Sequence, residues 1–182
     1  EPLRVYSRDG LLMGEFGEMR CTPVRFEQIP QVLIHAVLAA EDDRFFEHSG
    51  VDWMGVARAM AVNVATADAG QGGSTITQQL AKNLFSTRGS ELEGSLTKLG
   101  GPIKLVISKT KEWIISVQLE RNFTKEEIIA MYLNTAAFGS NAYGIKVASQ
   151  TYFKKTPDSL NIQEAAVLVG MLQAITRFNP VF

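Results

Sequence analysis

The chain has 182 residues, of which 46% are hydrophobic and 20% are charged. This length suits a single domain with its own hydrophobic core. Its 18 basic and 19 acidic side chains nearly balance, so the composition indicates neither disorder nor a general electrostatic attraction to nucleic acid. The single cysteine excludes an internal disulfide framework and a cysteine-cluster zinc site. No apolar run reaches the ~18 to 20 residues that span a bilayer.

The N-terminal residues predict a small β-hairpin. Two short β-prone runs, 3–7 and 11–16, flank Asp9-Gly10, a dipeptide that favours the positive φ angles of a tight turn. After Pro30 the chain has a helical pattern. We therefore expect a mainly α-helical protein, with a β-hairpin and linker over residues 1–26 and a helical domain over residues 27–182.

Pro30 suits the first turn of a helix. After it, apolar residues recur at helical spacing in two places. The first set consists of Val32, Ala36, Val37 and Ala40. It precedes the acidic run 41–43, which should therefore fall near a helix end. Asp52 can cap the next helix. We expect its apolar stripe to face the core: Trp53, Val56, Ala57, Met60 and Val64.

A third helix is expected to begin after Ser74, which offers an N-cap. Ser74, Gln78 and Lys82 then share one polar face that could line a site, opposite an apolar face of Ile76, Leu80 and Leu84. Residues 86–108 mix glycines with an apolar patch and predict a mobile surface segment. Helical character resumes at Thr110.

Two later helices should begin with capping boxes, Thr124-x-x-Glu127 and the weaker Asn161-x-x-Glu164.

Carboxylates are the first candidates for chemistry. The acidic run Glu41-Asp42-Asp43 and Glu112 could form opposite walls of a cleft. Paired carboxylates suit glycosyl chemistry because one moves a proton while the other manages charge on the leaving side. The alternative for Glu112 is a surface ion pair with Lys109 at i, i+3. His48 is either a catalyst or, more commonly, a hydrogen-bonded loop anchor.

Three lysines, Lys82, Lys109 and Lys111, could hold an anionic group such as a diphosphate, helped by the N–H groups of the helix that opens near Ser74. No GxGxxG, Walker, HExxH or GxSxG pattern occurs. The two histidines do not make a convincing metal site by themselves.

Five ordered motifs resemble those of peptidoglycan glycosyltransferases, the domain of class A penicillin-binding proteins and of monofunctional relatives. Residues 41–50 resemble ED-x-x-F-x-x-H-x-G, and residues 72–83 closely resemble G-x-S-T-I-T-Q-Q-x-x-K-N. Residues 109–112 are similar to the end of R-K-x-K-E. The fourth and fifth motifs are matched by Tyr132-Leu133-Asn134 with Gly139, Gly144 and Tyr152-Phe153, and by Glu164-Ala165-Ala166 through Asn179-Pro180.

This resemblance implies a lysozyme-like helical fold and polymerisation of lipid II into peptidoglycan glycan strands at the outer face of the cytoplasmic membrane. It makes Glu41 the general base that deprotonates the 4-hydroxyl of the acceptor for attack on C1 of the donor, with inversion. It associates Glu112 with the departing undecaprenyl diphosphate, together with a divalent cation, Mg²⁺ or Mn²⁺.

The motif matches and the lysine argument together give these substrate-binding candidates: Ser74, Gln79, Lys82, Lys109, Lys111 and Arg88. Arg88 is included because Ser108 stands where the third motif usually has arginine. The resemblance also allows a fused transpeptidase domain and the cell-wall synthesis machinery as partners.

A polyprenyl substrate further implies that segment 86–108 is membrane-proximal. The candidate membrane contacts are Leu84, Phe85, Leu105, Val106 and Ile107, with burial in the core as the alternative. Two other functions stay open: a lysozyme-like, glycan-cleaving enzyme and a non-catalytic glycan-binding module. The polar 72–83 helix favours synthesis over cleavage, and the presence of both Glu41 and Glu112 counts against a non-catalytic module.

Overall fold

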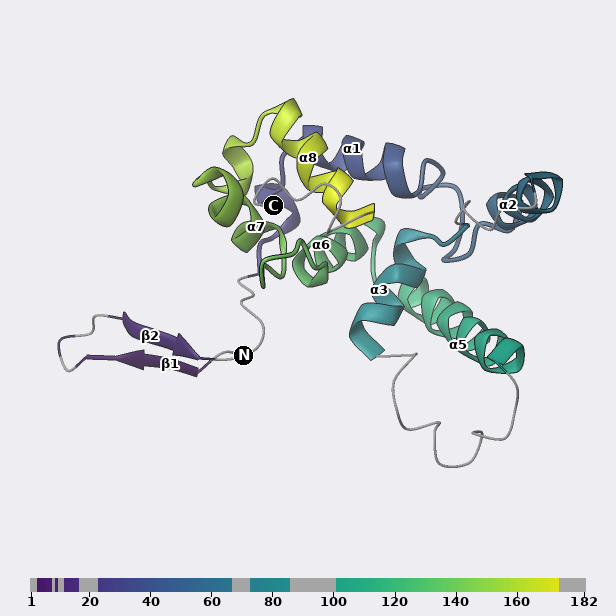
Figure 1. The fold of residues 1–182 in the computed structure, drawn as a ribbon, viewed down its shortest axis with the longest axis horizontal. Coiled ribbons are helices and arrows are strands. Elements are labelled where there is room, and N and C mark those ends of the chain that lie inside the picture. Colours follow the sequence, from purple (N-terminus) through teal and green to yellow (C-terminus); the bar gives the residue numbers. More distant parts are fainter. Residues whose placement is uncertain are drawn as a thin grey trace. The chain divides into compact units, whose positions relative to one another are not determined.

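The computed structural model describes residues 3–7, 9, 12–16, 23–66, 73–85 and 101–173. Within these ranges the chain is mainly helical (Figure 1), as the sequence predicts. It divides into two compact units, one of Glu1–Val37 with Leu133–Phe182 and the other of Leu38–Tyr132. No helix in the described ranges is both long enough and apolar enough to cross a membrane.

Near the N-terminus, strands β1 (Leu3–Tyr6) and β2 (Leu12–Phe16) pair antiparallel, with Leu3 opposite Phe16. Gly10 of the expected turn lies outside the described residues. The predicted hairpin appendage therefore stays a prediction.

The described α-helices are α1 (Gln31–Glu41), α2 (Trp53–Thr66), α3 (Ile76–Phe85), α5 (Gly101–Asn122), α6 (Lys125–Thr135), α7 (Ile145–Phe153) and α8 (Ile162–Gln173). Two short 3₁₀ helices accompany them, at Phe26–Gln28 and Pro157–Ser159.

Both predicted capping boxes are confirmed. At the start of α6, the Thr124 N–H donates to Glu127 Oε2 at 2.8 Å and the Glu127 N–H donates to Thr124 Oγ1 at 3.3 Å. At the start of α8, Asn161 and Glu164 exchange the same two bonds, each at 2.9 Å. These bonds satisfy N–H groups that have no partner inside the helix.

The first unit is held by bonds that tie its loops to its helices. Asn134 accepts a hydrogen bond from the Val24 N–H at 2.9 Å and donates one to the Val24 carbonyl at 2.8 Å. The Tyr152 hydroxyl donates to the Phe138 carbonyl at 2.8 Å. Gly144 has a φ of +81°, and a Cβ there would lie 2.7 Å from the Asn134 carbonyl oxygen. These fourth-motif residues therefore stabilise the fold.

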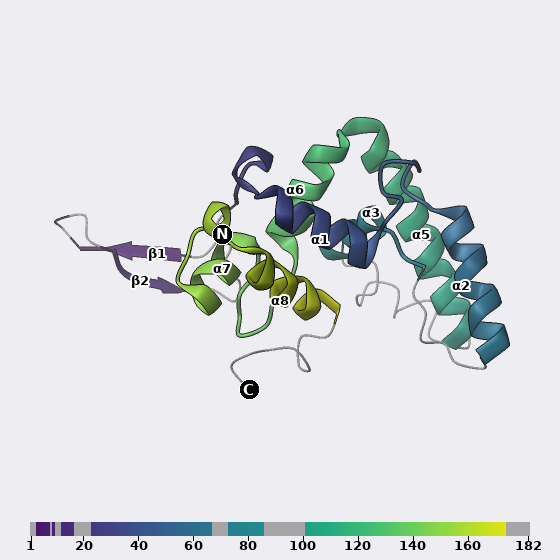
Figure 2. The ribbon, with the colours of Figure 1, turned by 90° about the horizontal axis from the view of Figure 1, so that it is seen from above.

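In the second unit, α3 lies along α5, as Figures 1 and 2 both show. The Thr77 hydroxyl of α3 donates to Glu120 of α5 at 2.6 Å. Helix α2 contacts α5 through Trp53 and Trp113, whose rings meet edge to face with centroids 5.1 Å apart.

The prediction that the apolar stripe of α2 faces the core is wrong. Trp53 and Met60 are 62% and 63% exposed. The buried positions are instead Gly55 and Ala59, because α2 passes close to Gly73, where a Cβ would lie 3.2 Å from the Ala59 Cβ. Where two backbones approach closely, only small residues fit at the contact. The large apolar residues of α2 therefore lie on another face, and hydrophobic periodicity predicts the wrong face as buried.

In helix α1, Val37 is the one residue of the four at helical spacing that is buried, and the helix also buries Leu33 and Ile34. Val32 is 38% exposed. The helix does end at Glu41, as the acidic run indicates.

Helix α5 begins at Gly101, whereas the sequence predicts that helix resumes at Thr110. Pro102 explains the earlier start, because its fixed φ suits a first helical turn and its missing N–H costs nothing there. The last part of the predicted mobile segment is thus helical. Its earlier part, residues 86–100, lies outside the described residues.

Candidate active site

Glu41, the last residue of α1, has two carboxylate oxygens in different surroundings. Oε2 accepts a hydrogen bond from Nε2 of Gln79 on α3, at 2.7 Å. Oε1 is buried and has no hydrogen-bond partner. One oxygen is therefore held by the protein, while the other can still accept a proton or a hydrogen bond.

Gln79 is in turn bound by Tyr132 of α6, whose hydroxyl donates to Gln79 Oε1 at 3.0 Å. The Tyr132 side chain is 2% exposed. Burial, and secondly the charge of Glu41, raise the pKa of Tyr132 well above its usual range. The hydroxyl consequently keeps its proton and acts as a donor.

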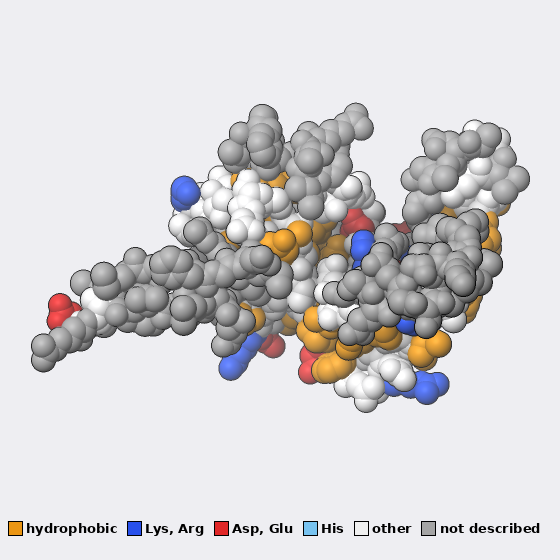
Figure 3. All heavy atoms as spheres, turned by 60° about the horizontal axis from the view of Figure 1, so that its bottom comes forward, with side chains coloured by type: hydrophobic (Ala, Val, Ile, Leu, Met, Phe, Trp, Pro, Cys, Tyr) orange, Lys and Arg blue, Asp and Glu red, His pale blue; other side chains and the backbone are white. Residues whose placement is uncertain are grey.

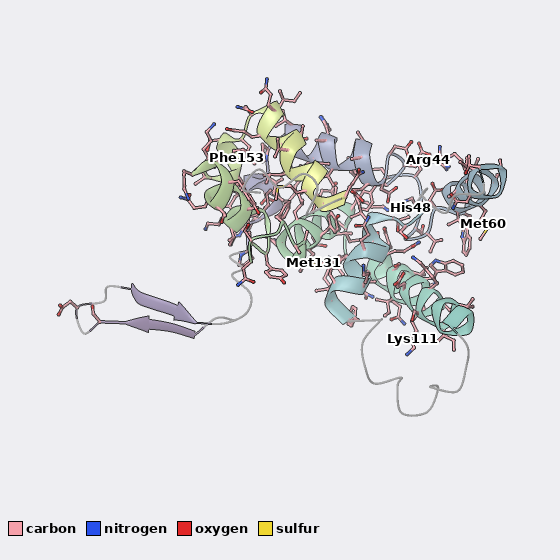
Figure 4. All side chains as sticks on the ribbon, viewed as in Figure 1. Arg44, His48, Met60, Lys111, Met131 and Phe153 are labelled. Atoms are coloured by element: carbon pink, nitrogen blue, oxygen red, sulfur yellow. The ribbon has the colours of Figure 1, made fainter. Side chains whose placement is uncertain are left out.

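The loop that follows α1 contains His48 (Figure 4), and it is anchored by hydrogen bonds of His48 and Asp42. His48 Nδ1 accepts from the Gly50 N–H at 3.2 Å, so Nε2 carries the ring proton and donates it to Asp42 Oδ2 at 3.0 Å. The same Asp42 oxygen accepts from the Ile76 N–H at the start of α3, also at 3.0 Å. His48 is thus a loop anchor.

Gly50 allows this loop to contact α5. Its φ is +94°, and a Cβ there would lie 2.9 Å from the carbonyl carbon and oxygen of Ser116. The Gly50 carbonyl accepts a bond from the Thr75 hydroxyl at 2.6 Å. Thr75 Oγ1 also accepts from the Gln78 N–H at 3.2 Å. Thr75 therefore caps α3, and the predicted cap at Ser74 is wrong because the helix begins at Ile76.

Ser74 instead belongs to a second cluster, with Lys109 and Glu112 of α5. Lys109 Nζ donates to Ser74 Oγ at 2.9 Å and to Glu112 Oε2 at 2.8 Å. The Glu112 side chain is 2% exposed, whereas that of Lys109 is 36% exposed. Glu112 does pair with Lys109 as the alternative proposed, but its carboxylate is buried and not exposed on the surface.

Two cavities of the second unit meet at Gly73 and Ser74. One, of about 60 Å³, is lined by Glu41, Asp43, Arg58 and other residues. The other, of about 240 Å³, is lined by Lys109 and by apolar side chains that include Met60 and Trp113. Ser74 thus lines both the cavity that contains Glu41 and the cavity that contains Lys109.

The predicted polar face of α3 is only partly correct. Gln78 is 2% exposed and its amide lies 3.5 Å from the Gly50 carbonyl, so it faces the interior. Gln79, off that face, is the residue that reaches Glu41. Lys82 is exposed on α3, and Lys111 is exposed on α5 (Figure 4). Arg88 lies outside the described residues.

Sequence reasoning missed two residues that support this site. Tyr132 appears only as part of a motif match, with no role. Lys125 donates to the His48 carbonyl at 2.7 Å across a separation of 77 residues, pairs with Glu120 at 2.8 Å, and lies 4.3 Å from the ring centroid of Phe45. No local pattern could have revealed either contact.

A family model described as Transglycosylase matches residues 9–182. The chain therefore belongs to the transglycosylase family, and the resemblance to the peptidoglycan glycosyltransferase domain of class A penicillin-binding proteins is confirmed.

Its relatives include penicillin-binding protein 1A of Haemophilus influenzae, 42% identical over 182 residues, and that of Escherichia coli, 41% identical over 181 residues; each match covers 100% of this chain and 20% of the relative. Penicillin-binding protein 1A of Pseudomonas aeruginosa is 44% identical over 179 residues, or 98% of this chain and 20% of the relative. The chain thus spans about a fifth of the length of these curated relatives.

Proposed function

We propose that this chain polymerises lipid II into peptidoglycan glycan strands by inverting glycosyl transfer, with Glu41 as the general base. The observation that carries the proposal is the state of the Glu41 carboxylate. Gln79 holds Oε2 at 2.7 Å, and the buried Oε1 has no hydrogen-bond partner. An acceptor hydroxyl can supply the missing hydrogen bond and then give up its proton.

In this mechanism the acceptor 4-hydroxyl gives its proton to Glu41 Oε1 as its oxygen forms a bond to C1 of the donor sugar. The bond between C1 and the diphosphate oxygen breaks, and its electron pair leaves with undecaprenyl diphosphate. Attack opposite the leaving group inverts the configuration from α to β. A positioned general base contributes typically ~10² to 10⁴ in rate.

The Ser74 cluster suits the leaving diphosphate. Lys109 is partly exposed and held from two sides, by Ser74 at 2.9 Å and by Glu112 at 2.8 Å, so its ammonium is oriented before substrate binds. Charge-assisted bonds from lysine to phosphate oxygens are among the stronger hydrogen bonds in proteins. The exposed Lys82 and Lys111 would add positive charge, and Arg88 stays a predicted contact.

The divalent cation also stays a prediction. Within the described ranges, no group of three or more His, Cys, Asp or Glu side chains is placed to hold a metal, and the Glu112 carboxylate is already paired with Lys109. These residues do not fit a resident metal site. A cation would have to arrive with the diphosphate, whose oxygens would be its main ligands.

We also propose a lysozyme-like arrangement of the helices, the N-terminal hairpin appendage, and a location at the outer face of the cytoplasmic membrane. Exposed apolar side chains support the membrane contact: Leu84 is 43%, Phe85 56% and Val106 65% exposed, and Figure 3 shows hydrophobic side chains at the surface of one face. Ile107 is partly buried. A fused transpeptidase domain would fit relatives that are named penicillin-binding proteins.

The Lys109–Glu112 pair favours synthesis over cleavage of glycans. A hydrolase of the lysozyme type needs a protonated carboxylic acid as its general acid. In this chain the buried Glu112 carboxylate instead pairs with the Lys109 ammonium at 2.8 Å, and a cation at this position suits an anionic leaving group.

Incubation of the protein with labelled lipid II tests the proposal. We expect elongated glycan strands, and we expect their formation to be lost in the Glu41→Gln variant. Cleavage of preformed strands would indicate a hydrolase. An unchanged substrate from a folded protein would indicate a binding module.

A further inference from the structure

Tyr132, Gln79 and Glu41 form a chain of two hydrogen bonds that links three helices. The Tyr132 hydroxyl of α6 donates to Gln79 Oε1 on α3 at 3.0 Å, and Gln79 Nε2 donates to Glu41 Oε2 at the end of α1 at 2.7 Å. We propose that Tyr132 is a positioning residue that, through the amide of Gln79, orients the Glu41 carboxylate for proton transfer. This inference rests on the proposed function of Glu41.

The direction of the two bonds is decisive. A glutamine amide has an accepting end and a donating end. If the amide of Gln79 were reversed, its oxygen would face the Glu41 carboxylate, and two acceptors would repel each other. The Tyr132 hydroxyl stabilises the observed orientation by donating its proton to Gln79 Oε1 at 3.0 Å. With Tyr132 donating at one end and Glu41 accepting at the other, the amide keeps its NH₂ group toward Glu41.

Burial strengthens these two hydrogen bonds. Tyr132 is 2% exposed, and its raised pKa keeps the hydroxyl protonated across the working pH range. Gln79 is itself only partly exposed. In such surroundings water competes poorly for the amide, and a hydrogen bond is stronger than in bulk solvent.

The consequence for Glu41 is geometric. With Oε2 fixed by Gln79, the carboxylate cannot rotate freely, so Oε1 keeps one direction. Oε1 is the buried oxygen without a partner, and it is the oxygen that would take the proton. A misplaced base loses rate even when its chemistry is intact.

Steady-state kinetics on labelled lipid II, with the purified protein, test the inference. Tyr132→Phe removes only the hydroxyl, and we expect kcat to fall ~10-fold while KM for lipid II stays within about twofold, since Tyr132 does not touch substrate. Gln79→Ala should lower kcat at least as much. The double variant should be no slower than Gln79→Ala alone, because Tyr132 acts through Gln79.

Tyr152→Phe is the matched control. It also removes a hydroxyl that donates a hydrogen bond, here to the Phe138 carbonyl at 2.8 Å in the other unit. It should lower the melting temperature without lowering kcat. A purely structural role for Tyr132 predicts that Tyr132→Phe behaves in the same way, and that result would overturn the inference. Multiplying losses in the double variant would also overturn it.

Two further variants keep the outcomes separable. If Tyr132→Phe does not fold, Gln79→Asn replaces it. The shorter side chain keeps the amide but cannot reach both Tyr132 and Glu41, so a parent-like kcat would overturn the inference.

Glu41→Gln tests the proposed function itself. A folded Glu41→Gln variant with parent activity would refute the general base, whereas an inactive Glu41→Gln beside a fully active Tyr132→Phe would refute only the positioning role.

Discussion

The two glutamates of the site differ in how the protein surrounds them. Glu41 meets a neutral amide at one oxygen and nothing at the other, which is buried. Glu112 is buried more completely and is matched by the ammonium of Lys109 at 2.8 Å. A carboxylate with an open oxygen can take a proton, whereas one paired with a cation is suited to holding that cation in place. Under the proposed function the two glutamates therefore serve different purposes, and the partner of each carboxylate decides which.

The largest effect is expected from Glu41→Gln, which keeps the size of the side chain but removes the base. Turnover of lipid II should fall by ~10² to 10⁴, with little change in binding of a donor analogue. Single-turnover assays and analogue titrations separate the two. A folded Glu41→Gln variant that polymerised at near-parent rate would show that Glu41 is not the base, and the proposed functional difference between the two glutamates would be lost.

Lys109→Ala tests the surroundings of the other glutamate, Glu112. It removes the ammonium partner of a buried carboxylate and a candidate diphosphate contact, so we expect donor-analogue affinity to fall by ~10- to 100-fold. The free energy of unfolding should also fall, by ~1 to 3 kcal/mol. Calorimetric titration and chemical denaturation measure the two effects.

Lys82→Ala is the comparison for that variant. Lys82 is exposed on α3, so its loss should weaken donor binding without changing the free energy of unfolding by more than ~0.5 kcal/mol. If both variants bound the analogue as the parent does, the diphosphate site would be misplaced.

A smaller effect is expected at the apolar surface of the same unit. Val106→Asp places a charge on a side chain that is 65% exposed, so the fold should persist while affinity for anionic liposomes falls severalfold. Cosedimentation with vesicles measures this. Ile162→Asp, also at a side chain that is 65% exposed but in the other unit, should leave binding unchanged. Equal losses in both variants would argue against a specific membrane surface on α5.

The smallest effect concerns the first unit, where Glu164 pairs with Lys155. The bond from Lys155, with that from the Asn161 backbone, lowers the pKa of Glu164 from its ordinary value of 4.5. Glu164 therefore adds stability above about pH 4.5, and this contribution is lost as the pH falls through the lower pKa of the folded state. The melting temperature of the parent should exceed that of Glu164→Gln at pH 7, and the two should converge once the pH has fallen below the lowered pKa of Glu164. A constant difference over that range would contradict the assignment.

Local patterns predicted the local structure well. The capping boxes at Thr124 and Asn161, the cap at Asp52 and the end of α1 at Glu41 each depend on residues a few positions apart. The motif match likewise placed Ser74, Lys109 and Glu112 in one site, and the structure brings these three side chains into contact.

Contacts between distant segments could not be read in this way. Tyr132 and Gln79 lie 53 residues apart, and nothing in their spacing indicates a bond. Hydrophobic periodicity also gave the wrong buried face for α2. It shows where apolar residues recur, but it does not show which face of the helix another backbone approaches. Gly55 and Ala59, the buried positions, look unremarkable in a hydrophobicity pattern.

Gly50 limits how the sequence can vary. A Cβ there would meet the Ser116 backbone at 2.9 Å, and the φ of +94° is one that L side chains rarely adopt. Because the obstacle is main chain in the middle of a helix, no change of rotamer can relieve it. Selection for escape from an inhibitor that binds beside His48 should therefore yield variants at the exposed Asp43 or Glu47, while position 50 stays glycine in every surviving clone.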